Sequence, residues 1–211
     1  LDQLSDGRLL LLFVLGLKQA HELDAQSVVA SERSAMLEES LHIMRTLWSG
    51  ELLEHQGRFY SYDGIQLAVR PKQDPLEIWL GGQVPAALRR CGRIGEGWMP
   101  GLCSPEEAAV MREDVMAEAV AAGREIDDEH FGMNLSWVDG QMSDELLASI
   151  EARRPGFDPA HTIGCGASGL AERMHAFLDV GFSKFVIRPA EPPTDWAAAV
   201  ESVSEVLTLQ N

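Results

Sequence analysis

Three short segments of this chain carry residues suited to binding an anionic ligand. Gly81-Gly82-Gln83 lies between an apolar run and a helical pattern, and Met99-Pro100-Gly101 occupies the next such junction. Glycine lacks a Cβ atom, so an anion can approach the backbone closely, and the amides that begin a helix favour negative charge. Gln83 adds a side-chain donor, and Arg188, at the end of a later apolar run, adds a cation. These residues are the predicted ligand-binding set.

Each member of this set also has a purely structural interpretation. Gly81-Gly82 could serve only as a tight strand-to-helix turn, and Met99-Pro100-Gly101 could serve only in packing. Arg188 could pair with one of the 33 acidic residues. Residue types alone leave both interpretations open.

A second glycine-rich segment, Gly164 to Gly169, reads G-x-G-x-x-G, the pattern of a dinucleotide-binding turn. That function requires a strand that runs into the first glycine and an acid at the tip of the next strand. Here residues 155–161 are rich in Pro and Gly, only Thr162-Ile163 remains as strand, and Glu191 lies beyond the strand tip. We therefore interpret the segment as a glycine-rich loop in which Ser168 caps a helix. Its helix start could still contact a phosphate, and a Rossmann-type reductase stays the weaker hypothesis.

The sequence identifies no catalytic residue. Its six histidines have no metal-ligand spacing, and neither a G-x-S-x-G elbow nor a Walker loop occurs. The three cysteines, Cys91, Cys103 and Cys165, are dispersed and odd in number, so neither a disulfide framework nor a zinc site is indicated. A reducing, cytoplasmic setting fits this pattern best.

The elements that position these segments alternate between strand and helix. Apolar runs and turn residues predict strands over 9–15, 77–80, 97–99, 130–138 and 184–188. Helical spacing predicts helices from Ser31 to Gly50 and over 85–94, 105–122, 142–152, 170–178 and 195–208. A hairpin over 53–69 is expected to turn at Asp63-Gly64.

Two of these elements carry specific expectations. The run Leu9 to Leu15 is continuously apolar, which predicts a strand buried on both faces. Ser104-Pro105-Glu106-Glu107 is a capping box with proline at the first helical position.

Alternating strands and helices predict an α/β fold with a parallel sheet. A doubly wound sheet and a (β/α) barrel compete, because the non-hairpin strands predicted above are fewer than the eight of a full barrel, which needs about 250 residues. The chain has 211 residues and begins with Leu1 rather than Met. We therefore expect it to be part of a longer protein.

Composition narrows the class of partner. The chain has 17 basic and 33 acidic residues, a net charge of −16, which argues against nonspecific nucleic-acid binding. Hydrophobic residues make up 45 % and charged residues 24 %, as in globular domains, and the longest apolar run is too short for a membrane helix. Neither nucleic acid nor a membrane is therefore an expected partner.

Several segments together resemble the bacterial-luciferase-like monooxygenase family, and within it the F420-dependent oxidoreductases. The segments that carry the resemblance are residues 1–9, Phe59-Tyr60, Ile78 to Gly82, Pro85 to Arg90, Gly95 to Gly101 and Phe182 to Pro189. Their order and spacing cover nearly the whole chain. One departure is that Leu12 to Leu15 fill a stretch where the family usually has glycines at alternate positions.

This resemblance implies a (β/α)8 TIM barrel, in which residues 1–211 form a single domain that supplies about the fourth to the eighth strand. It implies F420, or alternatively FMN, as cofactor, bound at the predicted set Gly81, Gly82, Gln83, Met99, Pro100, Gly101 and Arg188. The implied activity is hydride transfer or oxygenation of a small organic substrate, with a homodimer as a possible assembly. The catalytic residues would lie on the early strands, outside this chain. A different hypothesis is a non-catalytic half-barrel that associates with itself or a partner through open strand edges.

Overall fold

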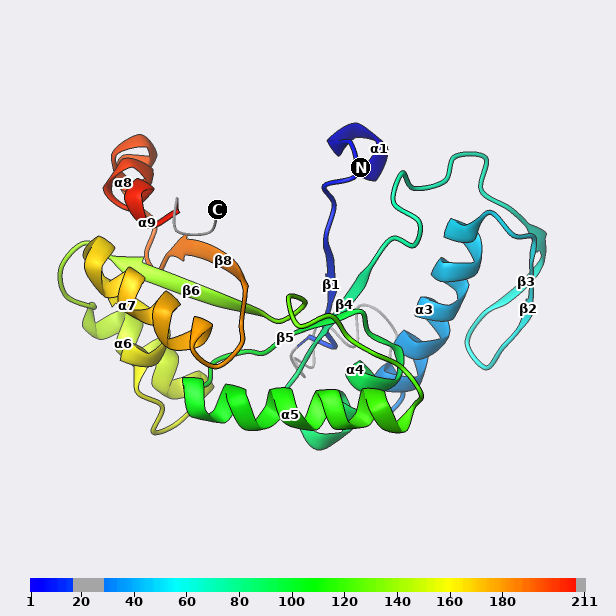
Figure 1. Ribbon diagram of the computed structural model, residues 1–211, viewed down its shortest axis with the longest axis horizontal. Helices are drawn as coiled ribbons and strands as arrows, with labels where there is room; N and C mark the ends of the chain where they lie inside the picture. The colour runs from blue at the N-terminus through cyan, green and yellow to red at the C-terminus, as the bar shows by residue number, and fades with distance from the viewer. Residues whose placement is uncertain (17–28, 208–211) are drawn as a thin grey trace. The chain divides into compact units, whose positions relative to one another are not determined.

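The computed structural model describes residues 1–16 and 29–207, which divide into two compact units, Leu1–Ile78 and Trp79–Asn211 (Figure 1). The first contains α1 (Asp2–Ser5), β1 (Leu11–Phe13), α3 (Arg33–Ser49), β2 (Leu53–Gln56) and β3 (Ser61–Ile65). The chain then continues through β4 (Ile78–Gly81), α4 (Pro85–Ile94), β5 (Gly97–Met99), α5 (Pro105–Ala121), β6 (Gly132–Val138) and α6 (Asp144–Arg153). It ends with η1 (Pro159–His161), β7 (Ile163–Cys165), α7 (Gly166–Leu178), β8 (Lys184–Pro189), α8 (Trp196–Ser202) and α9 (Ser204–Leu207). The predicted alternation of strand and helix is confirmed.

The first apolar run forms the strand β1, but the prediction that it is buried on both faces was wrong. Leu10, Leu12 and Val14 are 44 %, 39 % and 59 % exposed. A parallel strand is buried on both faces only where other layers cover both of them. One face of this apolar strand of the first unit is therefore exposed.

Helix α3 ends as predicted but begins differently. Gly50 terminates it in the left-handed conformation, at φ 82°, which glycine adopts without strain. The N-cap is Glu32, and neither Glu32 nor the predicted Ser31 caps the helix through its side chain. The predicted cap was wrong because the helix starts one residue later.

The hairpin exists, but its turn lies elsewhere than predicted. Strands β2 and β3 are antiparallel, with His55 opposite Tyr62 and Gln56 opposite Ser61, so the chain reverses over residues 57–60. Gly64 lies inside β3 as the extra residue of a bulge, between the pairs Leu53–Ile65 and Glu54–Asp63, at φ 71°. Asp63-Gly64 supplies a bulge conformation rather than a turn.

The position of the turn is set by Glu39 of α3. The Glu39 carboxylate accepts hydrogen bonds from the backbone amides of Arg58, Phe59 and Tyr60, at 2.9–3.2 Å. The His55 Nε2 atom lies 3.0 Å from the same carboxylate. A Cβ atom at position 57 would lie 2.0 Å from Glu39 Oε1, so only glycine leaves room for this approach. We call Glu39, His55 and the amides of residues 58–60 the hairpin latch.

The hairpin latch should make the stability of the first unit depend on pH. Burial raises the pKa of Glu39, but the hydrogen bonds from His55 and the three amides outweigh burial, so the pKa lies below its ordinary value. A carboxyl with a lowered folded-state pKa stabilises the fold above its unfolded pKa, about 4.3, and loses that contribution as pH falls through the folded pKa. Glu39→Gln is expected to lower Tm at pH 7 and to reduce the dependence of Tm on pH below about 5. Thermal melts between pH 3 and 7 measure both effects.

Glu54→Gln is the matched control for this prediction. Glu54 is exposed on β2, and its carboxylate forms no hydrogen bond or ion pair with the described residues. Hydrogen exchange should show faster exchange of the amides of residues 58–60 in Glu39→Gln but not in Glu54→Gln. Equal protection of these amides in both variants would contradict the latch.

In the second unit, β4, α4, β5 and α5 follow the predicted boundaries closely. Ser104 accepts the amide of Glu107, and the Glu107 carboxylate accepts the amide of Ser104, which is the predicted capping box. Strands β4 and β5 are parallel, with Gly81 opposite Met99. The glycine-bounded ends of both strands therefore lie at the same edge.

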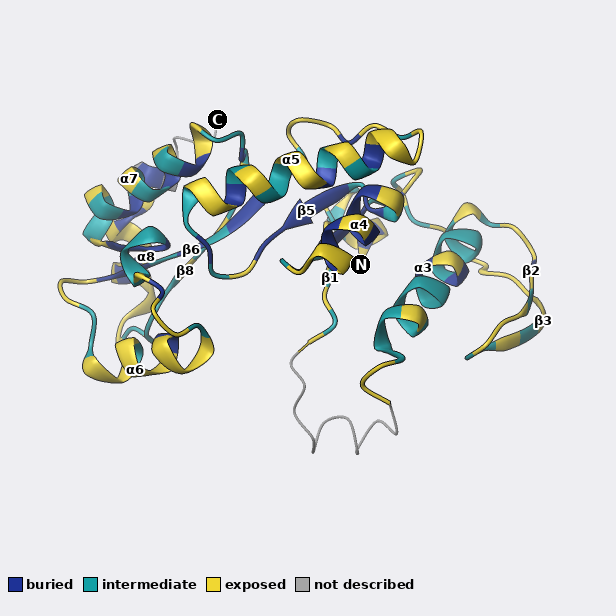
Figure 2. Ribbon diagram, turned by 90° about the horizontal axis from the view of Figure 1, so that it is seen from below, coloured by how far each residue is buried: buried dark blue, intermediate teal, exposed yellow. Residues whose placement is uncertain are grey.

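The core of this unit centres on an aromatic cluster formed by Trp98, Phe131, Phe177 and Phe182. All four side chains are at most 1 % exposed. The Trp98 ring lies 6.5 Å from Phe131 and 6.0 Å from Phe182, and Phe177 lies 5.7 Å from Phe182. In Figure 2, β5 is buried along its length, whereas α6 is largely exposed. The cluster fixes β5 against the strands that follow it.

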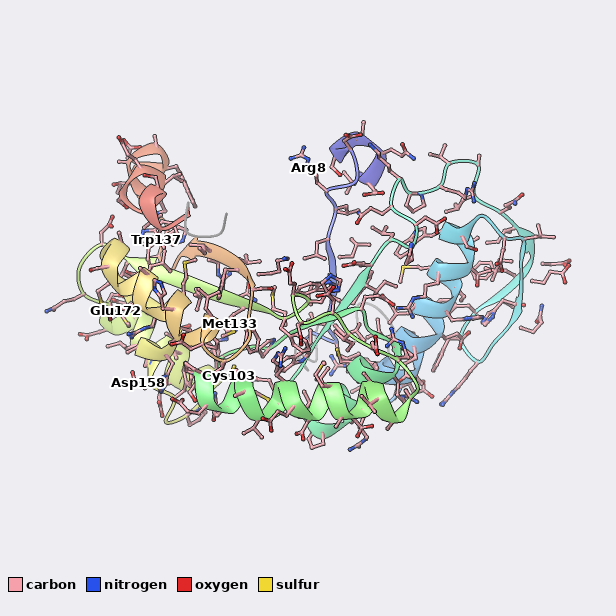
Figure 3. The ribbon with its side chains drawn as sticks, in the orientation of Figure 1. Arg8, Cys103, Met133, Trp137, Asp158 and Glu172 are labelled. Carbon is pink, nitrogen blue, oxygen red and sulfur yellow. The ribbon has the colours of Figure 1, made fainter. Side chains whose placement is uncertain are left out.

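Strands β7, β6 and β8 form a parallel sheet in that order. Along β6, Met133, Leu135 and Trp137 are buried, whereas Asn134 and Ser136 are partly exposed (Met133 and Trp137 are labelled in Figure 3). Helix α7 packs on β6 and β7. The sheet thus has one apolar face and one face that carries polar side chains.

Strand β7 was not predicted at this length, and it adds a sixth non-hairpin strand to the described residues. Helix α7 begins at Gly166 with Cys165 as N-cap and no side-chain cap, so the predicted cap at Ser168 was wrong. The predicted closing helix is broken at Val203 into α8 and α9. Among the described residues, no helix combines the length and apolar character needed to cross a membrane.

Candidate functional site

Each of the predicted ligand-binding segments lies at the carboxyl end of a parallel strand of the second unit. Gly82 follows β4, Pro100 follows β5, and these two strands are neighbours. Arg188 lies near the end of β8, opposite Ser136 of β6. In α/β barrels this edge of the sheet carries the active site.

Gly82 is required by the backbone of its loop. Its φ is 117°, and a Cβ atom there would lie 2.7 Å from Ala87 Cβ. Trp98 Nε1 donates a hydrogen bond to the Gly82 carbonyl at 2.9 Å, so the aromatic cluster holds this loop in place. The loop conformation is therefore fixed from inside the core.

The first turn of α4 offers fewer donors to a ligand than the sequence implies. Pro85 has no N–H, and the amides of Ala87 and Leu88 donate to the carbonyl of Val84. The predicted contribution of helix amides to anion binding is reduced accordingly.

Gln83 and Met99 are occupied by contacts within the protein. Gln83 Nε2 donates to the carbonyl of Leu102 at 3.0 Å, which ties the loop after β4 to the loop after β5. Asn134 Nδ2 donates to Met99 Sδ at 3.2 Å, and Met99 is buried. Gln83 and Met99 therefore position the strand ends. Pro100, which follows Met99, is buried as well.

Gly101 and Arg188 share a cavity of about 380 Å³. Polar residues that line it and that the sequence analysis missed are Asn134, Ser136, Ser149, Arg153 and Thr162. Alternation along β6 could have identified Asn134 and Ser136 as side chains of one face. Arg153 and Thr162 carry no such signal, because they reach the cavity from α6 and from the residue before β7.

Gln83 lines a different cavity, of about 500 Å³, with Glu107 and Arg154. The Arg154 guanidinium donates a hydrogen bond to the Glu107 carboxylate. This bond stabilises the charged form of Glu107, so the pKa of Glu107 lies below its ordinary value. The predicted set therefore does not form one continuous surface.

A larger cavity, of about 550 Å³, lies beside Trp137 at the ends of β6 and β8 (Trp137 is labelled in Figure 3). Its lining includes the carboxylates of Asp139, Glu191 and Asp195. Asp195 accepts the amides of Ala197 and Ala198 at the start of α8. Acidic walls make this cavity unsuited to an anionic ligand.

No metal-binding group of three or more His, Cys, Asp or Glu side chains occurs among the residues that the structure describes. Burial raises the pKa of the Cys91 and Cys103 thiols to about 12, so these thiols stay protonated. The cavity that holds Arg188 is lined by no carboxylate, histidine or cysteine of the described residues. The described site can bind and orient a ligand, and it supplies no general acid or base.

The glycine-rich segment 164–169 is not built as a dinucleotide-binding turn. Strands β7 and β8, which flank α7, do not pair with each other, because β6 lies between them. A Cβ atom at Gly164 would lie 2.2 Å from the amide nitrogen of Leu170. The first glycine of this pattern is needed for close packing of α7 on β7.

Comparison with known proteins identifies a family whose model matches nearly all of the chain. Residues 1–203 match a family model described as luciferase-like monooxygenase. An F420-dependent glucose-6-phosphate dehydrogenase of Nakamurella multipartita is 34 % identical over 103 residues, which are 46 % of this chain and 29 % of that protein. The matched part thus spans less than a third of that relative.

Solved structures share the fold. An F420-dependent secondary alcohol dehydrogenase in complex with an F420–acetone adduct superposes with a TM-score of 0.79 at 16 % identity, covering 100 % of this chain and 72 % of that one. The oxygenating constituent of 3,6-diketocamphane monooxygenase from the CAM plasmid of Pseudomonas putida, in complex with FMN, gives a TM-score of 0.69 at 16 % identity, covering 97 % and 71 %.

Proposed function

Because the chain belongs to the luciferase-like monooxygenase family, we propose that it is part of an F420-dependent oxidoreductase that transfers a hydride to or from a small organic substrate. The expected partial TIM barrel is confirmed, because the chain shares its fold with the F420-dependent secondary alcohol dehydrogenase described above. The observation that carries the proposal is the meeting of Gly81-Gly82 and Met99-Pro100-Gly101 at the carboxyl edge of two paired strands.

The residues at this edge fit a cofactor with a phosphate-bearing tail. Gly101 is exposed, so a ligand can reach it, and a Cβ atom there would come within 3.2 Å of Gln83 Oε1. Arg188 lines the same cavity as Gly101 and supplies a positive charge there. Gly82, held by Trp98, and Gln83, held on Leu102, would keep the loop in shape before the ligand arrives. When bound, a deazaflavin supplies the centre that accepts or donates the hydride.

FMN is the alternative cofactor. The curated relative named above is F420-dependent, which favours F420, whereas the diketocamphane enzyme holds FMN on the same fold. Both carry a ring system and an anionic tail, and the contacts of Gly101 and Arg188 suit either tail. Parallel titrations with F420 and FMN separate the two.

Gly101→Asp is expected to weaken binding of the preferred cofactor at least about tenfold, because it places a negative charge beside an anionic tail in the cavity that Arg153 and Arg188 line. Fluorescence and absorbance titrations of the purified chain with F420 and FMN measure the effect.

Gly123→Asp is the matched control for this variant. Gly123 follows α5, a Cβ atom there meets nothing within 4 Å, and aspartate is among the residues that tolerate its φ of 70°. Cofactor affinity should stay within about twofold of the original chain. Equal affinities in both variants would exclude this edge as the cofactor site.

A second candidate function is association through open apolar surface, without catalysis. It is favoured in the first unit by the exposed residues Leu12 and Val14, and in the second by Val186 of β8, which is 48 % exposed. A folded chain that binds neither F420 nor FMN but sedimented as a dimer or larger species would support this candidate over the enzyme.

A further inference from the structure

The cavity that contains Gly101 and Arg188 has a charge pattern that the proposed cofactor contacts do not explain. We call it the α6 cavity, because helix α6 forms one wall and the ends of β6 and β8 form the other. Its polar lining consists of Asn134, Ser136, Ser149, Arg153, Thr162 and Arg188. All of these residues belong to the second unit.

Two arginines, Arg153 and Arg188, line the α6 cavity, and no carboxylate of the described residues lines it. The chain carries 33 acidic residues against 17 basic ones, yet no Asp or Glu of the described residues lines this cavity. Neither Arg153 nor Arg188 forms an ion pair within the part of the chain that the structure describes. The adjacent Arg154, by contrast, pairs with Glu107 and donates to the Leu102 carbonyl.

The cavity also holds hydroxyl groups that could bind an oxygen of a ligand. Ser136 lies opposite Arg188 in the register of β6 and β8, so both reach the cavity from neighbouring strands. Thr162 is only 2 % exposed, and its Oγ1 has no hydrogen-bond partner among the described residues. A buried hydroxyl without a partner is uncommon, because leaving it unpaired costs free energy.

We propose that the α6 cavity is a binding subsite for an oxyanion, a phosphate or carboxylate group, held by Arg153 and Arg188 with Ser136 and Thr162 as hydroxyl partners. Guanidinium groups bind such oxyanions through two charge-assisted hydrogen bonds. A volume of about 380 Å³ lies within the range of small-molecule sites and leaves room for the rest of a ligand. This inference rests on the proposed function for the origin of the oxyanion, which is either the substrate or the tail of the cofactor.

The first test uses inorganic phosphate as probe. Isothermal titration at constant ionic strength, with phosphate replacing chloride, is carried out on the full chain and on Arg153→Gln, Arg188→Gln and Arg89→Gln. Arg89 is the matched control, since it is exposed on α4 and lines a separate cavity with Asp114 and Glu118. Arg153→Gln and Arg188→Gln are each expected to weaken phosphate binding about tenfold, and Arg89→Gln less than about twofold.

Two outcomes overturn the subsite. One is the absence of saturable phosphate binding by the folded chain, and the other is an equal loss of affinity in all three variants, which would reflect net charge alone. Because Arg153 and Arg188 are both exposed, their replacement should leave the fold intact, and far-UV circular dichroism with a thermal melt verifies this.

A second test identifies the source of the oxyanion with FMN and riboflavin, which differ by one phosphate group. If Arg153→Gln lowers the affinity for FMN but not the affinity for riboflavin, the subsite holds the cofactor's phosphate. If the variant weakens binding of inorganic phosphate and leaves the affinities for both F420 and FMN unchanged, the subsite holds an anionic substrate. Phosphate binding by a chain that binds neither F420 nor FMN would retain the subsite and reject the proposed function, so the two failures are distinguishable.

Discussion

Replacing Gly164 with alanine is expected to lower the free energy of unfolding by about 3 kcal/mol, the upper end of the usual range for overpacking. The added Cβ atom would lie 2.2 Å from the amide nitrogen of Leu170 and 2.4 Å from the carbonyl carbon of Gly169. Both are backbone atoms of α7, so relief requires the helix to move away from β7. For a chain of this length the loss corresponds to a Tm lower by roughly 6–12 °C, which differential scanning calorimetry measures.

Gly166→Ala is the control within the same pattern. A Cβ atom at Gly166 meets nothing within 4 Å, and the cost comes only from a φ of 67°, about 1 kcal/mol. The contact at Gly164 predicts that Gly164→Ala is the more destabilising variant by a clear margin. The reverse order would show that backbone conformation, and not packing of α7 on β7, decides the role of the pattern.

This comparison also changes how a loss of ligand binding in Gly164→Ala is to be understood. A dinucleotide-binding turn predicts that Gly164→Ala abolishes cofactor binding. The structure predicts unfolding or displacement of α7 instead, which would abolish binding of any ligand nearby. Affinity measurements on this variant therefore need a melt recorded in parallel.

Trp98→Ala should be the second strongly destabilising variant, with a loss of about 3–5 kcal/mol. The Trp98 side chain is fully buried in the aromatic cluster and packs on Phe131 and Phe182. Its removal leaves a cavity that the surrounding rings cannot fill, since buried aromatic side chains seldom rearrange enough to close such a space. Chemical denaturation monitored by circular dichroism gives the free energy.

Trp98→Phe separates packing from hydrogen bonding. Phenylalanine keeps a ring in the cluster but cannot donate to the Gly82 carbonyl, which Trp98 Nε1 reaches at 2.9 Å. We expect about 1–2 kcal/mol of destabilisation, together with weaker cofactor binding through the loop after β4. If the two variants at position 98 are destabilised equally, the hydrogen bond and not the ring would be the main contribution.

Local chemistry explains which elements could be predicted. Helix α4 has the predicted bounds because Pro85 suits the first turn of a helix. Helix α5 begins at the predicted capping box, in which proline and a Ser-Glu pair define a helix start within four residues. Strand β5 likewise lies between glycine and proline. At these places the sequence and the fold depend on the same few neighbouring residues.

The remaining features depend on residues far apart in the chain. The hairpin turns at residues 57–60 because the carboxylate of Glu39, in the preceding helix α3, accepts hydrogen bonds from the backbone amides of the turn. The α6 cavity combines Arg153 with Arg188 and Gly101, which no local pattern connects. Gln83 was predicted as a ligand donor, yet the structure uses its amide to hold Leu102. Long-range partners of this kind become visible only when the elements are placed in space.

The hairpin latch has a consequence for how this protein can diversify. A tight turn is usually encoded by its own residues, such as Asn-Gly, which restricts what can stand at its tip. Here the conformation of residues 58–60 is imposed by one carboxylate that binds backbone amides, and amides are common to every residue except proline. The side chains at the tip make contacts of their own, Arg58 with Glu32 and Tyr60 with Ser40. The bonds from Glu39 to the backbone do not depend on which side chains these are, as long as Glu39 and Gly57 are kept. Substitutions at the tip are therefore expected to exchange these side-chain contacts for new ones while the backbone of the turn is kept.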